Sequence, residues 1–265
     1  MIDSHCHIDL DAFDDDRDEV IERAIQAGVK RFLVLGLSNQ QFSKLLVLKQ
    51  QYAQIDIALG LHPYFLNEPA PENKVKHQTQ LMLDELSQIA EQHLKHFVAF
   101  GEMGLDGDIA LSMSYQEEVL RYQLNVATKH KKPVILHHRK SHNQLIRLLK
   151  EQRYQGGGIL HAFSGSYQDA KTYLDMGFLL GVGGTITYSR ASKTRNSIAK
   201  LPLDRLVLET DSPDMPLNGF QGQRNQPSQL ALVLKALSEL KNISEMEVEK
   251  QTTTNYLTLF GLSLN

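Results

Sequence analysis

The stretch PVILHHR at 133–139 reads as a strand that is apolar along its length and polar only where it ends. Its apolar residues occupy both faces, which is typical of a parallel strand covered on both sides. The stretch DRLVLETD at 204–211 has the same pattern. These two segments predict buried parallel strands with polar side chains at their carboxyl ends.

Six further segments have the composition of short strands, which brings the number to eight. The predicted strands are 1–9, 31–36, 55–62, 97–102, 133–139, 158–163, 178–185 and 205–211. Amphipathic helical periods lie between them, as in 20–25 and 145–149. Eight strand–helix units predict a (β/α)8 TIM barrel of class α/β, formed as one domain over 1–265, with an additional C-terminal helix at 244–262. A doubly wound open sheet is the alternative.

The overall composition is that of a soluble globular protein. Of the 265 residues, 42% are hydrophobic and 22% are charged, and the formal net charge is −3. Any nucleic-acid contact must therefore come from a local basic patch. One cysteine, no apolar run long enough to span a bilayer and an acidic N-terminal stretch predict a cytoplasmic protein without a membrane or an obligate protein partner.

The N-terminal sequence MIDSHCHIDL places His5 and His7 two residues apart. On a strand they point to the same side, whereas Cys6 points to the other and is expected to be a buried small residue. The two imidazoles can share a metal ion, or they can be hydrogen-bonded residues at a strand edge. Asp3, on the same side as His5, is expected to be a buried polar brace.

Nearly every predicted strand ends in residues that can bind a metal or move a proton. The ends are SHCHID at 4–9, GLHPY at 60–64, FGEMGLD at 100–106, ILHHRK at 135–140, ILHAFSG at 159–165 and LETDSP at 208–213. In a barrel of parallel strands these ends meet at one face, where catalytic residues lie. The sequence therefore predicts a single site that collects histidines and carboxylates.

Strand periodicity assigns these side chains to faces. On 133–139, His137 and Arg139 share the side of the site, and His138 is expected to pack beneath the helices. On 205–211, Asp211 lies nearer the mouth than Glu209, so Asp211 is the ligand candidate and Glu209 its support.

Five of these motifs, IDSHCHID, FGEMGLD, VILHHR, LHAFSG and LETDSP, resemble in this order the TatD family of metal-dependent hydrolases, within the amidohydrolase-like barrel superfamily. The resemblance covers nearly the whole chain. It implies a dinuclear site in which His5, His7 and Asp211 hold one ion, Glu102 bridges, and His137 and His161 hold the second. It also implies similarity to a deoxyribonuclease. One departure lies at the mouth, where Lys140 stands in place of the acidic residue that often follows HxR.

Two divalent ions can activate water and polarise a phosphoryl oxygen. Glu102 and Asp211 are the catalytic candidates, the first as a bridge and the second as the base that takes a proton from water. Ligation by four imidazoles favours Zn or Mn over Mg, which prefers oxygen ligands.

Substrate contacts are predicted for His62, Arg139, Arg224 and Asn225. Arg139 suits a phosphate or a carboxylate. His62 is otherwise a turn residue before Pro63, and the loop position of Arg224 and Asn225 equally allows a structural role.

Three basic residues follow the seventh predicted strand, namely Arg190, Lys193 and Arg195. Barrel enzymes frequently bind phosphate in this region, although each residue also fits a solvated helix start.

The leading hypothesis is a hydrolase that cleaves phosphodiester bonds, with DNA as a possible substrate. The alternative is a hydrolase of a small metabolite, such as a cyclic amide, a lactone or a phosphomonoester, on the same scaffold. A third hypothesis, from a different class, is an inert metal-binding protein, against which the complete ligand set argues.

Overall fold

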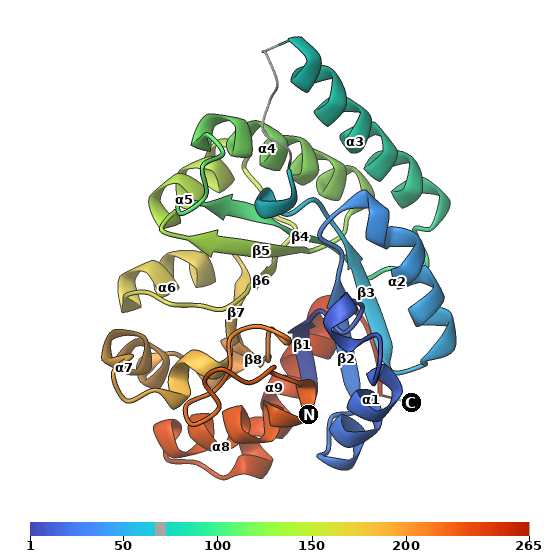
Figure 1. Cartoon of the computed structure of the whole chain (residues 1–265). Coiled ribbons are helices and arrows are strands. Elements are labelled where there is room, and N and C mark those ends of the chain that lie inside the picture. The colour runs from blue at the N-terminus through green and yellow to red at the C-terminus, as the bar shows by residue number, and fades with distance from the viewer. Residues whose placement is uncertain (67–72, 265) are drawn as a thin grey trace.

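The computed structural model describes residues 1–66 and 73–264, and of 73–79 the backbone alone. Strands and helices alternate along the chain (Figure 1). The strands are β1 (Ile2–Cys6), β2 (Arg31–Leu35), β3 (Ile55–Leu59), β4 (Ala99–Asp106), β5 (Val134–Arg139), β6 (Gly158–Leu160), β7 (Phe178–Val182) and β8 (Leu206–Leu208). The helices are α1 (Arg17–Gln26), α2 (Asn39–Gln51), α3 (Asn73–Gln92), α4 (Met113–His130), α5 (His142–Glu151), α6 (Tyr167–Asp175), α7 (Ser192–Lys200), α8 (Leu230–Lys241) and α9 (Glu245–Phe260).

The eight strands form one parallel sheet in sequence order, β1 to β8. The last strand comes back beside the first, where the Asp211 N–H donates to the His5 carbonyl at 2.9 Å. The buried Asp3 carboxylate joins the same two chain segments, because it accepts from the Thr210 N–H at 3.0 Å and from the Thr210 hydroxyl at 2.6 Å. The (β/α)8 barrel is confirmed, and Asp3 is the brace that the sequence predicted.

The core has two parts because each strand is buried on both faces. Side chains between the strands and the surrounding helices form the larger cluster. Side chains that point into the barrel form the smaller one, with one contribution from each strand and two from β2. This double burial explains why 133–139 and 204–211 carry apolar residues without alternation.

Helix α9 lies behind the barrel in the view of Figure 1 and packs against the interior cluster. Its Tyr256 is fully buried in that cluster and donates from its hydroxyl to Asp56 Oδ2 at 3.0 Å. The neighbouring Asn255 donates to the carbonyl oxygens of Leu203 and Leu206, each at 2.8 Å. The predicted additional C-terminal helix therefore covers interior residues of the barrel.

The predicted carboxyl ends of six strands needed correction, because β4 is longer and β1, β3, β6, β7 and β8 each end three residues earlier. Strand β4 continues to Asp106, four residues beyond the predicted end, because 103–106 pair with β5 after a shift in register. Gly104 permits this pairing, since a Cβ atom there would lie 2.0 Å from the His137 carbonyl oxygen. Strands β6 and β8 are three residues each, so their polar ends belong to the loops that follow.

None of the helices in the described part of the chain combines the length and the hydropathy of a bilayer-spanning segment.

Candidate metal centre

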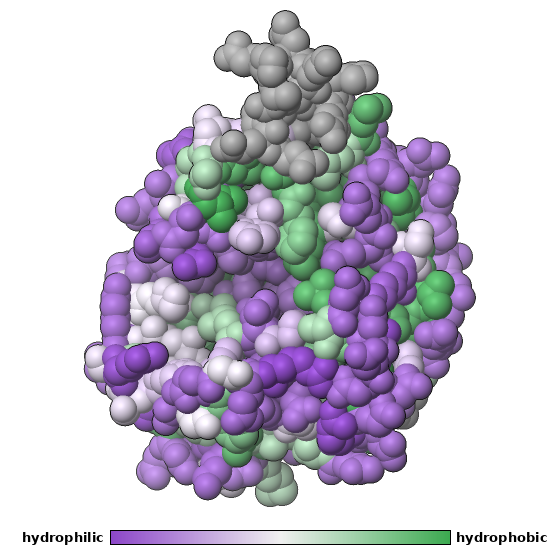
Figure 2. Space-filling model, in the orientation of Figure 1, coloured by the Kyte–Doolittle hydropathy of each residue, from purple (hydrophilic) through white to green (hydrophobic). Residues whose placement is uncertain are grey.

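Five histidines and two carboxylates from distant parts of the chain meet at the carboxyl ends of the strands. They come from β1 and the residue after it, from β4 and β5, and from the segments after β3, β6 and β8. These residues are His5, His7, His62, Glu102, His137, His161 and Asp211. Figure 2 shows that hydrophilic residues prevail around the recessed middle of the face seen in Figure 1. The convergence that the sequence predicted is thus present in the structure.

The first group of donors surrounds one oxygen of Glu102. His5 Nε2 lies 3.1 Å from Glu102 Oε2 and 3.2 Å from His7 Nε2. Asp211 Oδ1 lies 3.4 Å from His5 Nε2 and 3.5 Å from His7 Nε2, and His7 Nε2 is 3.5 Å from Glu102 Oε2. Four donor atoms, from β1, the residue after it, β4 and the segment after β8, therefore face a common point.

The second group surrounds the other oxygen of the same carboxylate. Glu102 Oε1 lies 3.0 Å from His137 Nδ1 and 2.9 Å from His161 Nε2, and these two nitrogen atoms are 3.1 Å apart. His62 Nε2 is 3.4 Å from Glu102 Oε1. The two carboxylate oxygens thus separate two donor groups.

The spacing of the first group fits a metal ion. A tetrahedron with metal–ligand bonds of about 2.1 Å has edges of about 3.4 Å. The printed donor–donor distances of the first group run from 3.1 to 3.5 Å. Three overlapping trios in the described residues have ligand atoms within 4.8 Å of one another, namely His5–His7–Glu102, His62–Glu102–His137 and His5–His161–Glu209.

Hydrogen bonds orient two of these histidines for ligation. His7 Nδ1 lies 3.3 Å from the Leu35 carbonyl oxygen, so the ring proton resides there and Nε2 keeps its lone pair toward Glu102. His137 Nε2 lies 3.2 Å from Asp106 Oδ2, which fixes the opposite tautomer and turns Nδ1 toward Glu102. A second partner of this kind is typical of metal-binding histidines.

The role of Asp106 was missed by the sequence reasoning, although the residue lies within the motif FGEMGLD. The sequence signal is that Asp106 follows Glu102 by four residues on the same strand, so the two side chains point to the same side. Because β4 was predicted to end at Glu102, Asp106 was not considered for the site.

His62 is held in the other orientation. Its Nδ1 accepts from the Tyr64 N–H at 3.1 Å, so in the neutral ring the proton is on Nε2. The Nε2–H group points toward Glu102 Oε1. A ring nitrogen that carries a proton has no free lone pair, so it does not ligate a metal ion. The contact favours a polar role at the site over that of a mere turn residue.

Glu209 lies beside His161, a member of the second donor group. Its Oε1 accepts from the Ala162 N–H and lies 3.9 Å from His161 Nδ1. Burial raises the pKa of Glu209 to about 8. Glu209 therefore reaches the histidine after β6 rather than Asp211 on its own segment.

The cluster favours positive charge at its centre. Burial opposes ionisation of Glu102, yet the imidazoles around it, His161 foremost, hold its pKa well below its usual range. Burial also opposes the charge of Asp211, whose pKa is nevertheless lowered by the neighbouring imidazoles of His7, His5 and His161. Burial lowers the pKa of His5 to about 4, which leaves its ring neutral. Two ionised, buried carboxylates among imidazoles form an environment suited to cations.

The rim next to β5 carries both basic residues of HHRK. Arg139 is 62% exposed and its Nε pairs with Asp108 Oδ2 at 2.8 Å, and Lys140 pairs with the same carboxylate. His137 points inward, while the His138 ring packs at a tilt against His142 of α5 with ring centroids 4.3 Å apart. The predicted division of faces is therefore confirmed, and Lys140 lies at the rim.

Two of the residues predicted to contact substrate hold other groups of the protein. Arg224 pairs with Asp16 at 2.6 Å and stacks over the Phe13 ring, which ties it to the segment before α1. Asn225 is fully buried and donates to the Thr210 and Asp214 carbonyl oxygens, each at 2.8 Å. Both side chains thus hold the loop after β8 in place, and their predicted contact with substrate stays a prediction.

The three basic residues after β7 differ from one another. Arg195 donates to the Ile186 carbonyl oxygen, which gives it a structural contact. Lys193 is exposed on the first turn of α7. Arg190 is exposed and lies over the Tyr188 ring, 5.0 Å from its centroid.

Replacement of Asp106 by asparagine is expected to weaken binding at the second donor group by about 10- to 100-fold, because the charge that orients His137 is lost. The affinity of the first group is expected to change little. Titration of metal-free protein with Zn or Mn, followed by calorimetry, measures both affinities. Asp108→Asn is the matched control, since Asp108 contacts Arg139 and Lys140 but not His137. Equal affinities in the wild type and in Asp106→Asn would contradict this role.

Comparison with known proteins relates the whole chain to one family. A sequence model described as TatD related DNase matches residues 2–261. An uncharacterized metal-dependent hydrolase of Escherichia coli (strain K12), YjjV, is 43% identical over 99% of this chain and 98% of its own length. An uncharacterized metal-dependent hydrolase of Bacillus subtilis (strain 168), YabD, is 34% identical over 99% of this chain and 100% of its own length.

Solved structures agree with this relationship. The crystal structure of the Escherichia coli TatD homologue YjjV superimposes with a TM-score of 0.92 at 42% identity, and the match covers 99% of this chain and 98% of that one. An organophosphorus hydrolase from Deinococcus radiodurans has a TM-score of 0.69 at 14% identity, over 98% of this chain and 92% of that one, and shares the fold alone.

Proposed function

The chain belongs to the TatD related DNase family of metal-dependent hydrolases, and on that premise we propose that it cleaves phosphodiester bonds with two divalent metal ions. The observation that carries the proposal is the position of Glu102. One of its oxygens faces His5, His7 and the neighbouring Asp211, and the other faces His137 and His161. A carboxylate placed between two donor groups suits a bridging ligand.

The donor set indicates where each ion would bind. His5, His7, Asp211 and Glu102 Oε2 would hold the first, and His137, His161 and Glu102 Oε1 the second. When bound, such ions supply Lewis acidity that activates water and polarises a phosphoryl oxygen. Because four of the donors are imidazoles, Zn or Mn is favoured over Mg.

The residues of the chain then divide the remaining tasks. Asp211, whose carboxylate is ionised and close to His5 and His7, accepts the proton of the attacking water. His62 presents an N–H toward the second group and is suited to donate a hydrogen bond to a phosphoryl oxygen. Asp106 keeps the His137 ring in the tautomer that leaves Nδ1 free.

A phosphodiester is preferred as the substrate for two reasons. The family that matches the chain is described as a DNase family. In addition, Arg139 is exposed at the end of β5, and guanidinium groups recognise phosphate well. Because the net charge of the chain is −3, contact with DNA would depend on this local positive charge.

Metal removal tests the proposal directly. Protein stripped by a chelator is expected to lose activity on single-stranded DNA and on bis-p-nitrophenyl phosphate. Addition of Zn, Mn or Mg in separate reactions is expected to restore activity, with Zn or Mn more effective than Mg. Rates are measured by nitrophenolate release and by gel electrophoresis, and bound metal is measured by mass spectrometry.

The same panel distinguishes the alternative. It includes a phosphomonoester, a cyclic amide and a lactone beside the phosphodiesters. Hydrolysis of one of those three, with no cleavage of any phosphodiester under any of the metals, would overturn the proposal in favour of a small-metabolite hydrolase.

A further inference from the structure

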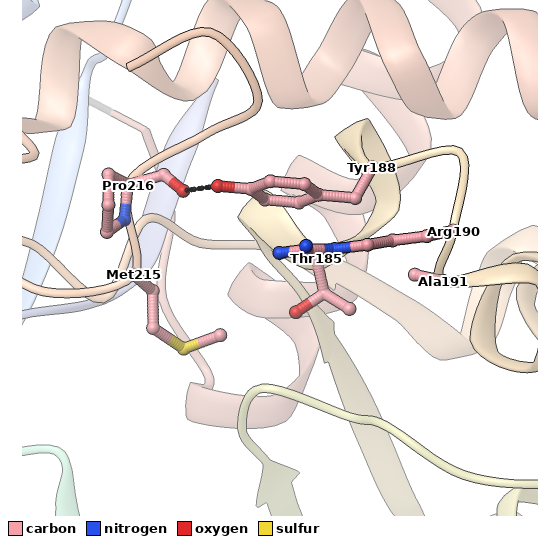
Figure 3. A pocket seen from close by; sticks show the side chains of 6 residues that line it. All are labelled: Thr185, Tyr188, Arg190, Ala191, Met215 and Pro216. Carbon is pink, nitrogen blue, oxygen red and sulfur yellow. Dashed lines mark hydrogen bonds between the residues drawn. The ribbon is translucent and has the colours of Figure 1, made fainter. Parts of the chain in front are cut away.

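A cavity of about 320 Å³ lies between the segment after β7 and the segment after β8 (Figure 3). Its lining residues are Thr185, Tyr188, Arg190, Ala191, Met215 and Pro216. The volume is at the lower end of the range for small-molecule pockets, about 300–1,000 Å³, so it accepts one group of nucleoside size. Neither the metal centre nor the roles assigned above use this cavity.

The walls combine an immobilised aromatic ring with an available guanidinium. The Tyr188 hydroxyl donates to the Pro216 carbonyl oxygen at 2.6 Å, which joins the two loops and fixes the ring. Arg190 runs alongside that ring, and its guanidinium points toward the space between Thr185 and Met215 (Figure 3). Within the described residues, Arg190 has this ring contact and no carboxylate partner. Stacking uses the flat face of the guanidinium and leaves its N–H edge available for phosphate.

The cavity is tied to the metal centre through the chain itself. Met215 stands four residues after Asp211, and the Asp214 N–H donates to the Asp211 carbonyl oxygen at 3.0 Å. Asn225 donates to the carbonyl oxygens of both Asp214 and Met215, at 2.8 and 3.3 Å. One pinned loop thus supplies a donor to the first metal group and a wall of the cavity.

We propose that this cavity binds the nucleoside next to the scissile phosphate, while Arg190 binds the following, non-scissile phosphate. The inference rests on the proposed phosphodiesterase function and specifies its substrate. Tyr188 and Met215 offer an apolar, polarizable surface to a base or sugar. The Arg190 guanidinium, which has no carboxylate partner in the described part of the chain, is suited to an anion, and in a nucleic-acid strand the next phosphate is one nucleotide away. The preferred substrate is therefore an oligonucleotide rather than a minimal phosphodiester.

Dinucleotides test the proposal. The probes are thymidylyl-thymidine, its 5′-phosphorylated form, its 3′-phosphorylated form and bis-p-nitrophenyl phosphate. One phosphorylated dinucleotide is expected to be hydrolysed with a kcat/KM about 10- to 100-fold above that of the unphosphorylated one, because of the charged hydrogen bonds. Arg190→Ala is expected to remove this advantage, mainly through KM, and to leave hydrolysis of bis-p-nitrophenyl phosphate unchanged. Arg190→Lys is expected to restore part of the advantage.

Lys193→Ala is the matched control, because it removes one exposed positive charge three residues away without altering the cavity. It is expected to keep the preference for the phosphorylated dinucleotide. Tyr188→Leu, which removes the ring, is expected to raise KM for every dinucleotide.

The outcomes separate the two proposals. If the wild type cleaves no phosphodiester, the proposed function fails. If it cleaves bis-p-nitrophenyl phosphate but shows no preference among the dinucleotides, or if Arg190→Ala and Lys193→Ala lose the preference equally, the function stands and the cavity proposal is overturned.

Discussion

Glu102→Gln is expected to lose nearly all phosphodiesterase activity and to bind both metal ions more weakly. The amide keeps one oxygen, but its nitrogen cannot ligate a cation, and the charge shared by the two donor groups disappears. Metal ions contribute several kcal/mol to the stabilisation of the transition state, and about 1.4 kcal/mol is a tenfold change in rate. The expected fall in kcat/KM is therefore about 10³-fold or more, measured beside metal content after dialysis.

Glu102→Asp tests the geometry separately from the charge. Aspartate is one methylene shorter, so it cannot reach both groups from the β4 backbone, and a loss close to that of glutamine is expected. Glu118→Gln, at an exposed position of α4, is the control and should behave as the wild type. Full metal content and activity in Glu102→Gln would show that the carboxylate does not bridge.

Asp211→Asn is expected to lower kcat by about 10²- to 10⁴-fold, the usual contribution of a general base. KM is expected to change little, because Asp211 faces the donor atoms of the first group and not the cavity between the loops. Since the asparagine oxygen can still act as a ligand, part of the first ion should be retained. Steady-state kinetics and metal analysis on the same preparation measure both effects.

Asp214→Asn is the matched control for this variant. Asp214 lies on the same loop, is exposed, and contributes its backbone to the loop contacts. It is expected to keep wild-type kcat. A similar loss in both variants would indicate damage to the loop rather than removal of a base, and unchanged kcat in Asp211→Asn would exclude Asp211 as the base.

Much of the fold could be predicted because burial on both faces leaves a direct mark on the sequence. Segments such as 133–139 and 204–211 are apolar without alternation. Eight predicted strands that alternate with helices fit a single (β/α)8 barrel. Strand ends were harder to predict. Whether 103–106 continue β4 depends on pairing with β5 and on space for Gly104, and neither property is local.

The candidate metal centre could be predicted as a set of residue types but not as a set of contacts. Histidines and carboxylates at strand ends indicated the convergence, and the resemblance to TatD proteins supplied the ligand set. Asp106, which orients His137, and the donor orientation of His62 were not evident, because tautomers are set by partners distant in sequence. The ion pair of Arg224 with Asp16, which lies 208 positions away in the sequence, was likewise not evident.

The sequence by itself determined which side chains stand at the carboxyl ends of the strands, since alternation along a strand and the right-handed strand–helix repeat are local rules. Tertiary structure alone decided which ring nitrogen faces Glu102, which arginines keep a free edge and where the cavity beside Arg190 opens. The physical reason is that hydrogen bonds and ion pairs form between groups that are close in space, whatever their separation in the sequence. Closure of the barrel brings β8 beside β1, and only then do Asp211 and His5 meet.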